Sequence, residues 1–241
     1  MTSTTPPHGS ATSPDQTSKA DASPLLIATG NPHKVDEIRA VLDGLGIACE
    51  GLGDLDAEYP EPDEDGETFE ANARIKATAY ARATGRVCLA DDSGLEIDAL
   101  DGRPGVHSAR YAADRLAQDA DRAHRDGANN AKVIEELTGV PSERRTARFV
   151  CVLCVASPEG EILAEVRGDF EGRIGEPAVD SIPRGTNGFG YDPLFLVAPA
   201  YERTSAELEP SEKNRISHRG SALVLLAEKI EAGALDRLRE G

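Results

Sequence analysis

Two adjacent carboxylates near the middle of the chain are the strongest candidates for chemistry. The apolar run Val87-Cys88-Leu89-Ala90 is typical of a buried strand, and Asp91-Asp92-Ser93-Gly94 follow it directly. Strand ends that open into polar loops are where α/β proteins place reactive groups. Neighbouring carboxylates repel each other, so we expect a cation or a proton to compensate them. The alternative is an Asx-type turn, in which Asp and Ser cap backbone N–H groups.

A second candidate lies at the start of the first predicted helix. The apolar run Leu25–Ala28 predicts a short strand, and Thr29-Gly30-Asn31-Pro32-His33-Lys34 follow it. Asn31 suits an N-cap and Pro32 the first helical position. The free N–H groups and positive dipole end of such a helix favour an anion, and Lys34 can add a full charge. The spacing matches neither a P-loop nor a dinucleotide fingerprint. An ordinary capped helix with a solvated lysine is the alternative.

An acidic loop and a lysine flank the two carboxylates in the sequence. The loop covers Glu58–Glu67, and one of its carboxylates could turn inward to share a magnesium ion with Asp91 or Asp92, because magnesium takes oxygen ligands. The next segment, Thr68–Thr84, predicts a helix that ends at Gly85. Lys76 lies on this helix, which leads straight into the strand, so we expect its side chain to point towards the carboxylates. A solvated loop and a snorkelling lysine are the alternatives.

Two further segments could contact a flat, anionic ligand. The first is the glycine-rich loop over Gly185–Pro193, where glycines beside exposed rings allow a ligand to approach the backbone and stack. Its candidates are Phe189, Gly190, Tyr191 and Asp192. The second is the start of the last predicted helix, Ser211–Arg239, where Lys213, His218 and Arg219 could read a phosphate or a carbonyl group. A plain turn and a solvated helix face are the alternatives.

The remaining pattern predicts an α/β protein with a mixed sheet. Strands alternate with helices in the first half, and a long helix is expected over Ala112–Leu137. Two strands joined by a turn at Pro158-Glu159-Gly160 then form a hairpin over Ala147–Ser157 and Glu161–Phe170. We therefore expect an elongated twisted sheet with flanking helices, in two lobes with the active-site cleft between them. Residues 25–241 are interpreted as one domain.

Composition limits the classes of function. The chain has 241 residues and a formal net charge of −17, which argues against a nucleic-acid surface. The first 24 residues are poor in apolar side chains and are predicted to be a disordered tail. With neither a signal peptide nor a membrane-spanning run, the protein is expected to be cytoplasmic and to make no membrane contact. The four cysteines lie mostly in apolar runs, and Cys151-x-x-Cys154 lacks a second ligand pair for zinc.

Six short motifs occur together in one order and carry a family resemblance. They are Thr29-Gly30-Asn31-x-x-Lys34, Thr68-Phe69-x-x-Asn72-x-x-x-Lys76-Ala77, Asp91-Asp92-Ser93-Gly94-Leu95, Gly105-x-x-Ser108-Ala109-Arg110-Tyr111, Gly188-Phe189-Gly190-Tyr191-Asp192-Pro193 and Ile216-Ser217-His218-Arg219. Each is weak alone, but in register they resemble the Ham1/inosine triphosphate pyrophosphatase family over residues 25–232.

The resemblance implies a magnesium-dependent homodimer that hydrolyses ITP, dITP and XTP to the monophosphate and pyrophosphate. By position, the Thr29–Lys34 turn would bind the triphosphate, Asp92 would accept the proton and bind magnesium, and Ser93 would contact the substrate. The segment Phe189–Asp192, with Lys213, His218 and Arg219, would surround the nucleotide. Lys76 would assist in catalysis, and Asp91 would shape the turn or the metal's surroundings.

Two departures from the family pattern leave roles open. The acidic loop reads Asp63-Glu64-Asp65-Gly66 where the family has Glu-x-Gly, so Glu64 is our predicted metal ligand, with Asp65 in reserve. The segment Ala112–Lys132 is longer and more charged than in shorter relatives, and no role is assigned to it. The alternative functions are a Maf-like pyrophosphatase of modified or pyrimidine nucleotides and a nucleotide sensor without turnover.

Overall fold

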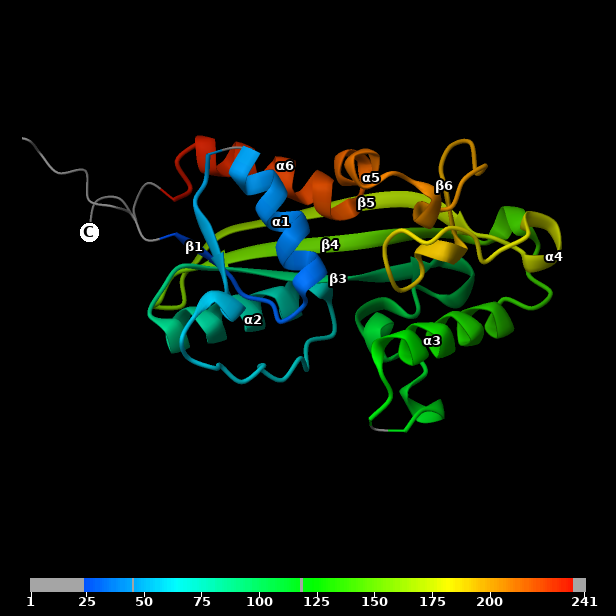
Figure 1. Cartoon of the computed structure of the whole chain (residues 1–241), viewed down its shortest axis with the longest axis horizontal. Helices are drawn as coiled ribbons and strands as arrows, with labels where there is room; N and C mark the ends of the chain where they lie inside the picture. The colour runs from blue at the N-terminus through cyan, green and yellow to red at the C-terminus, as the bar shows by residue number, and fades with distance from the viewer. Residues whose placement is uncertain (1–23, 45, 118, 236–241) are drawn as a thin grey trace, which may run out of the picture.

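One six-stranded sheet runs the length of the protein (Figure 1). The computed structural model describes residues 24–44, 46–117 and 119–235. The strand order is β2-β1-β3-β4-β5-β6, in which β1 is parallel to β2 and β3 and the other neighbours are antiparallel. The strands are β1 (Leu25–Ile27), β2 (Cys49–Gly51), β3 (Cys88–Ile97), β4 (Thr146–Ala156), β5 (Ile162–Ile174) and β6 (Phe195–Val197). The predicted mixed α/β sheet is confirmed.

Helices cover both faces of the first half of this sheet. Helices α1 (Pro32–Gly44) and α6 (His218–Glu231) pack on one face, and α2 (Phe69–Thr84) packs on the other (Figure 1). Successive side chains of a strand point to opposite faces. Thus Leu89 packs with α1 and α6, whereas Ala90 packs with α2. This alternation continues along β3 into the carboxylates.

The second half of the sheet carries a separate group of elements. Helix α3 (Arg122–Glu136) packs there with the 3-10 turn Gly105–Arg110. The remaining α-helices of the described residues are short: α4 covers Pro177–Asp180, and α5 covers Pro210–Ile216 and contacts α6. The core in this half contains Leu95 and Ile97 of β3. The 3-10 turn approaches β3 closely at Gly94, where an added Cβ would lie 2.4 Å from Ser108 Oγ and 2.7 Å from Gly105 O. Glycine is therefore required at this contact.

Three secondary-structure predictions are wrong. Residues 91–94 do not form a turn, because β3 continues through them to Ile97 and pairs with β4 throughout. The helix predicted over Ala112–Leu137 begins only at Arg122, where Asp121 caps it by accepting a hydrogen bond from His124 N. The helix predicted over Ser211–Arg239 is interrupted at Ser217, whose Oγ accepts from Gly220 N and starts α6 anew.

Other predictions hold or lie outside the described residues. Helix α2 begins after the N-cap Thr68 and ends at Gly85 in the left-handed conformation, and the β4–β5 hairpin is present. All four cysteines are free. Nearly all of the predicted tail, residues 1–23, is outside the described residues. That residues 25–241 are one domain stays a prediction. None of the helices described is both long and apolar enough to cross a membrane.

Candidate active site

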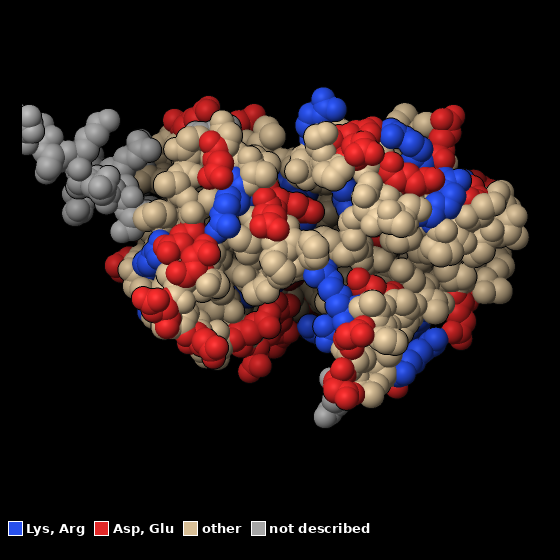
Figure 2. Space-filling model, in the orientation of Figure 1, with Lys and Arg blue, Asp and Glu red and all other residues tan. Residues whose placement is uncertain are grey.

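A cleft of about 510 Å³ lies beside β3, where β1 has ended and left the edge of β3 open. This volume is typical of small-molecule sites. Both halves of the protein line it, and Figure 2 shows it as a notch between acidic and basic walls. The lining includes most of the predicted site residues: Thr29, Gly30, Asn31, Pro32, Lys34, Glu64, Lys76, Asp92, Ser93, Phe189, Gly190, Tyr191, Asp192, Lys213, His218 and Arg219. His33 is not part of the lining but stacks on Phe189, with the ring centroids 5.9 Å apart.

Asp91 and Asp92 point to opposite faces of the sheet. Both belong to β3, and the pleat sends Asp91 towards α1 and α6 and Asp92 towards α2. Of the two alternatives, Asp91 or Asp92, the acidic loop therefore lies near Asp92, because Lys76 contacts both Asp92 and Glu64. Each has its own cations, and only Asp92 lines the cleft.

Asp92 forms a buried pair with Lys76 of α2. Lys76 Nζ lies 2.7 Å from Asp92 Oδ1 and 2.8 Å from Glu64 Oε1, so it joins the strand to the acidic loop. Burial raises the pKa of Asp92, and although Lys76 acts to lower it, the net shift is upward. Burial lowers the pKa of Lys76, but Asp92 and Glu64 outweigh this effect and leave the pKa raised. Lys76 thus stays charged, and the raised pKa makes Asp92 a stronger base than an ordinary carboxylate.

The acidic side of the cleft fits a hard cation in part. No cluster of three or more metal-type ligands occurs within the described part of the chain. However, Asp92 Oδ2 is buried without a hydrogen-bond partner, and Glu64 lines the same cleft. Such oxygens are suitable ligands for magnesium. Asp65, the reserve candidate, does not line the cleft, which favours Glu64.

Asp91 is the centre of a buried ion cluster that faces α1 and α6. Arg219 Nε donates to Asp91 Oδ2 over 3.0 Å, and Lys34 pairs with Oδ1. Ser93 Oγ donates to the same carboxylate over 3.1 Å, and Cys151 Sγ does so over 3.0 Å. Burial alone would raise the pKa of Asp91, but the charges of Arg219 and Lys34 hold it well below its usual range. Asp91 therefore does not shape a turn: it fixes two cations beside the cleft.

The glycine-rich loop presents an aromatic ring above the cleft. Gly188 has φ +84°, and an added Cβ there would lie 2.2 Å from Asp192 Oδ2. Asp192 Oδ2 accepts from Phe189 N over 2.8 Å and from Lys213 Nζ over 2.6 Å. These bonds hold the Phe189 ring in place. Tyr191 is buried and donates its hydroxyl to Ser108 O over 2.8 Å, which makes it an anchor of the loop.

His218 is held as a neutral side chain inside the site. Its ring stacks on Phe149 with the centroids 5.2 Å apart, and its Nδ1 is buried without a partner. Burial lowers the pKa of His218 well below its usual value, and the neighbouring charge of Arg219 adds to the effect. A neutral ring with an unpaired nitrogen is suited to read a polar group of a ligand.

This burial predicts a loss of stability in mild acid. As the pH falls below about 6.5, His218 takes up a proton in the unfolded chain but not in the folded protein, so proton uptake stabilises the unfolded state. We expect the free energy of unfolding to fall by about 1.4 kcal/mol more in the wild type than in His218→Gln between pH 7.5 and pH 5.5. Urea titrations of both proteins at these pH values measure the difference. Parallel pH profiles would show that His218 titrates normally.

Several residues that the sequence analysis did not single out also shape the site. Glu37 pairs with Arg219, and the helical spacing of Lys34 and Glu37 is the one signal that could have indicated it. Asp126 Oδ2 accepts from Gly190 N over 3.0 Å, and Arg122 lies over the ring of Phe189. Both come from α3, whose distance along the chain gives no signal. Asn72 Oδ1 accepts from Gly66 N over 2.9 Å and anchors the acidic loop rather than lining the cleft.

Comparison with known proteins agrees with this arrangement. The family model described as "Ham1 family" matches residues 25–229. The chain belongs to the Ham1 family. Among curated members, a dITP/XTP pyrophosphatase of an Exiguobacterium species is 52% identical over 206 residues, which cover 86% of this chain and 96% of the relative. The Bacillus subtilis dITP/XTP pyrophosphatase is 46% identical, with the same coverage of both chains.

Solved structures of Ham1 proteins have the same fold. The Ham1 protein of Staphylococcus aureus has a TM-score of 0.72 and is 35% identical, covering 87% of this chain and 99% of its own. A nucleoside-triphosphatase, or dITP/XTP pyrophosphatase, of Mycobacterium abscessus has a TM-score of 0.64 and is 44% identical, with coverage of 84% and 97%. The Ham1 fold therefore extends over nearly all of the described chain.

Proposed function

We propose that this protein hydrolyses non-canonical purine nucleoside triphosphates, namely ITP, dITP and XTP, to the monophosphate and pyrophosphate. The observation that carries the proposal is the position of Asp92, which has a buried oxygen without a hydrogen-bond partner and lines a cleft together with Lys34, Arg219 and Phe189. Cleavage of a phosphoanhydride requires charge neutralisation, positioning and a base, and these groups supply all three. The matched relatives named dITP/XTP pyrophosphatase support the same reaction.

We call the first half of the sheet with α1, α2 and α6 the first lobe, and the second half with α3 and the Phe189 loop the second lobe. In this mechanism the two lobes bind different parts of the nucleotide. The backbone N–H group of Gly30 and the ammonium of Lys34 hold the triphosphate at the N-terminus of α1. Phe189 provides a ring on which the purine stacks. The resulting orientation places the phosphate chain between α1 and Asp92.

Asp92 acts as the proton acceptor. A water molecule attacks a phosphorus atom of the chain, its proton moves to Asp92, and pyrophosphate leaves with the electrons of the broken P–O bond. Lys76 keeps Asp92 oriented, because its Nζ lies 2.7 Å from Asp92 Oδ1. Asp92 and Glu64 would hold the magnesium ion, which supplies charge neutralisation on the phosphates when bound.

Discrimination against ATP rests on the 6-keto group of the substrate. His218 keeps Nδ1 without a partner, whereas Arg219 commits Nε and both Nη atoms to Asp91, Glu37 and Ser93. Of the two predicted base readers, His218 is therefore better placed to bind the base. A site built to pair with one polar group leaves its own groups unpaired against another, which can discriminate strongly.

Product analysis tests the proposed function. With magnesium present, we expect ITP to yield IMP and pyrophosphate and to be turned over at least 100-fold more efficiently than ATP, by the pairing argument above. Anion-exchange chromatography of the products, with dTTP and UTP run in parallel and a chelator as control, measures this. IDP and phosphate as products would contradict the proposal, and preference for UTP would favour the Maf-like alternative, which the matched relatives do not support.

Release of pyrophosphate from ITP in this experiment would exclude the sensor alternative. The remaining predictions, a homodimer in the cytoplasm that binds neither nucleic acid nor membrane, are part of this proposal and rest on the family resemblance and the net charge.

A further inference from the structure

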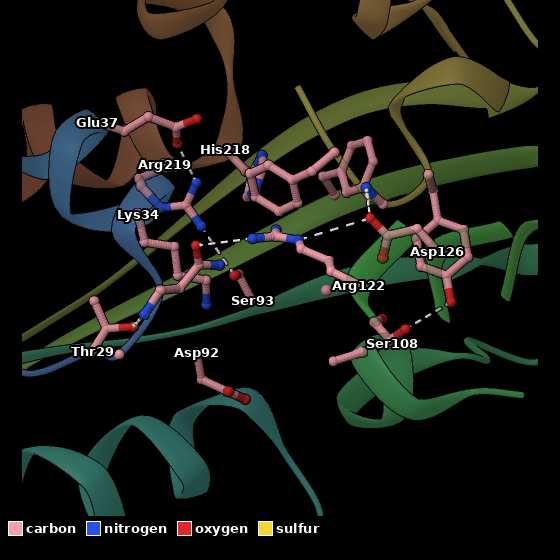
Figure 3. Close-up of a pocket in the computed structure, with 18 of the residues that line it drawn as sticks. Thr29, Lys34, Glu37, Asp92, Ser93, Ser108, Arg122, Asp126, His218 and Arg219 are labelled. Atoms are coloured by element: carbon pink, nitrogen blue, oxygen red, sulfur yellow. Dashed lines mark hydrogen bonds and ion pairs between the residues drawn. The ribbon is translucent and has the colours of Figure 1, made fainter. Parts of the chain in front are cut away.

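Arg122, in the first turn of α3, reaches across the cleft from one lobe to the other (Figure 3). Its Nη1 donates to Asn31 Oδ1 over 3.3 Å, and its guanidinium carbon lies 4.6 Å from the ring centroid of Phe189. One side chain thus contacts both the turn that precedes α1 and the aromatic ring of the opposite loop. It lies between the groups proposed to bind the phosphates and the base.

The Arg122 side chain is held to the second lobe near its Nε atom. Arg122 Nε lies 3.9 Å from Asp126 Oδ2, and the same oxygen accepts from Gly190 N over 3.0 Å. One turn further along α3, Asn130 Nδ2 donates to Gly190 O over 3.0 Å. The start of α3 and the loop that carries Phe189 therefore form one connected unit. Arg122 projects from this unit into the cleft in a defined direction.

Most of the hydrogen-bonding capacity of Arg122 is unused. A guanidinium has five N–H donors, and Arg122 makes one hydrogen bond, to Asn31. Arg219 in the same cleft differs, because Nε, Nη1 and Nη2 each donate to a side-chain oxygen. The side chain of Arg122 is 39% exposed and lines the cleft, so a ligand there can reach donors that have no hydrogen-bond partner. A planar, permanently charged fork with free donors is suited to bind phosphate oxygens.

The surroundings of Arg122 reinforce this preference for an anion. Arg110 of the 3-10 turn and Arg125 of α3 also line the cleft, and neither makes an ion pair with any residue that the structure describes. Glu61 and Glu64 of the acidic loop line the cleft as well. In a chain of net charge −17, a local group of three arginines is a strong exception. A cleft focuses the electrostatic field of such positive charges and thereby attracts anions.

We propose that Arg122 is a substrate-positioning residue that binds the phosphate chain of the nucleotide and closes the second lobe over it. This inference rests on the proposed function for the identity of the substrate. Arg122 takes no part in proton transfer, since Asp92 lies on the other side of the cleft (Figure 3). Its role is to hold the phosphates against the N-terminus of α1, which gives a function to one residue of the charged segment Ala112–Lys132.

The test uses a phosphate chain without a base. Inorganic tripolyphosphate is titrated into the full-length protein by calorimetry, and ITP kinetics are measured on the same samples. For Arg122→Ala we expect the tripolyphosphate Kd and the KM for ITP each to rise at least about tenfold, as loss of a charge-assisted contact predicts, with kcat lowered less than about threefold. Arg122→Lys should recover part of both. Arg115→Ala, which removes an exposed arginine paired with Glu135 outside the cleft, is the matched control and should change neither.

Each other outcome overturns the inference in a distinct way. An unchanged tripolyphosphate Kd with a raised KM would mean that Arg122 contacts the base or only supports Phe189. Equal losses in the Arg115→Ala control would mean a general charge effect. Arg122→Gln, with far-ultraviolet circular dichroism, separates a binding defect from misfolding. Should the wild type release no pyrophosphate from ITP, the proposed function fails, yet the tripolyphosphate titration still decides whether Arg122 binds a phosphate chain.

Discussion

Asp92→Asn is expected to lose turnover of ITP by about a thousandfold or more while it keeps its affinity for nucleotide. The amide preserves the shape of the side chain but cannot accept a proton, so the step that activates water is lost. Binding survives because the groups that hold the nucleotide, Lys34 and the Phe189 loop, are positioned by other residues. Loss of a carboxylate oxygen from the predicted magnesium site would add to the defect in turnover.

The kcat of Asp92→Asn and its Kd for IMP, which neither protein turns over, separate these two effects. The Kd is expected to stay within about threefold of the wild-type value, since an interaction used only in the transition state was removed. Asp98→Asn is the matched control, because Asp98 follows β3 but pairs with Arg148 outside the cleft. Wild-type turnover in Asp92→Asn would contradict the role of Asp92 as the proton acceptor.

Asp91→Asn is expected to destabilise the fold by about 3–5 kcal/mol, the usual cost of removing one partner from a buried ion pair. Asp91 has no exposed side-chain surface, and its partner Arg219 is only 2% exposed. The substitution leaves Arg219 with Glu37 as its carboxylate partner and removes the carboxylate that pairs with Lys34. Since the pKa of Asp91 is lowered in the folded state, the ionised carboxylate stabilises the protein at neutral pH.

The same linkage sets the pH range of this effect. The stabilisation by Asp91 is complete above the unfolded pKa of about 3.9 and is lost as the pH falls through the lower folded value. Urea unfolding at pH 7 measures the predicted difference between the wild type and Asp91→Asn. Asp98→Asn, which removes a partly exposed pair, should cost less than about 1 kcal/mol. A similar small cost for Asp91→Asn would refute the buried cluster as a source of stability.

The local signals in the sequence predicted much of the fold. Thr68 and Gly85 marked both ends of α2, because an N-cap hydroxyl and a left-handed glycine satisfy the free groups at helix ends. The glycines and aromatic rings of Gly185–Pro193 indicated a loop at the site, and this loop lines the cleft. Such features depend on a few neighbouring residues, so a single sequence contains them.

Features that depend on distant partners were missed. Adjacent carboxylates suggested a turn, yet pairing with β4 extends β3 through Asp91 and Asp92 and the pleat separates them. The position of Arg122 depends on the packing of α3 against the Phe189 loop, 60 residues or more away along the chain. The helix start at Ser217 was hidden within a continuous helical pattern, where Ser217 reads equally well as an interior residue.

The central claim is that the two adjacent carboxylates have separate tasks, Asp91 in the fold and Asp92 in the chemistry. The most direct test is urea unfolding of Asp91→Asn and Asp92→Asn in parallel at pH 7. Lys76 keeps Glu64 as a carboxylate partner at 2.8 Å when Asp92 is replaced, and the raised pKa of Asp92 shows that burial opposes its ionised form, so a neutral amide should cost little. We predict that Asp92→Asn unfolds within about 1 kcal/mol of the wild type or above it, whereas Asp91→Asn loses about 3 kcal/mol or more. Equal losses in both variants, or a larger loss in Asp92→Asn, would contradict the account.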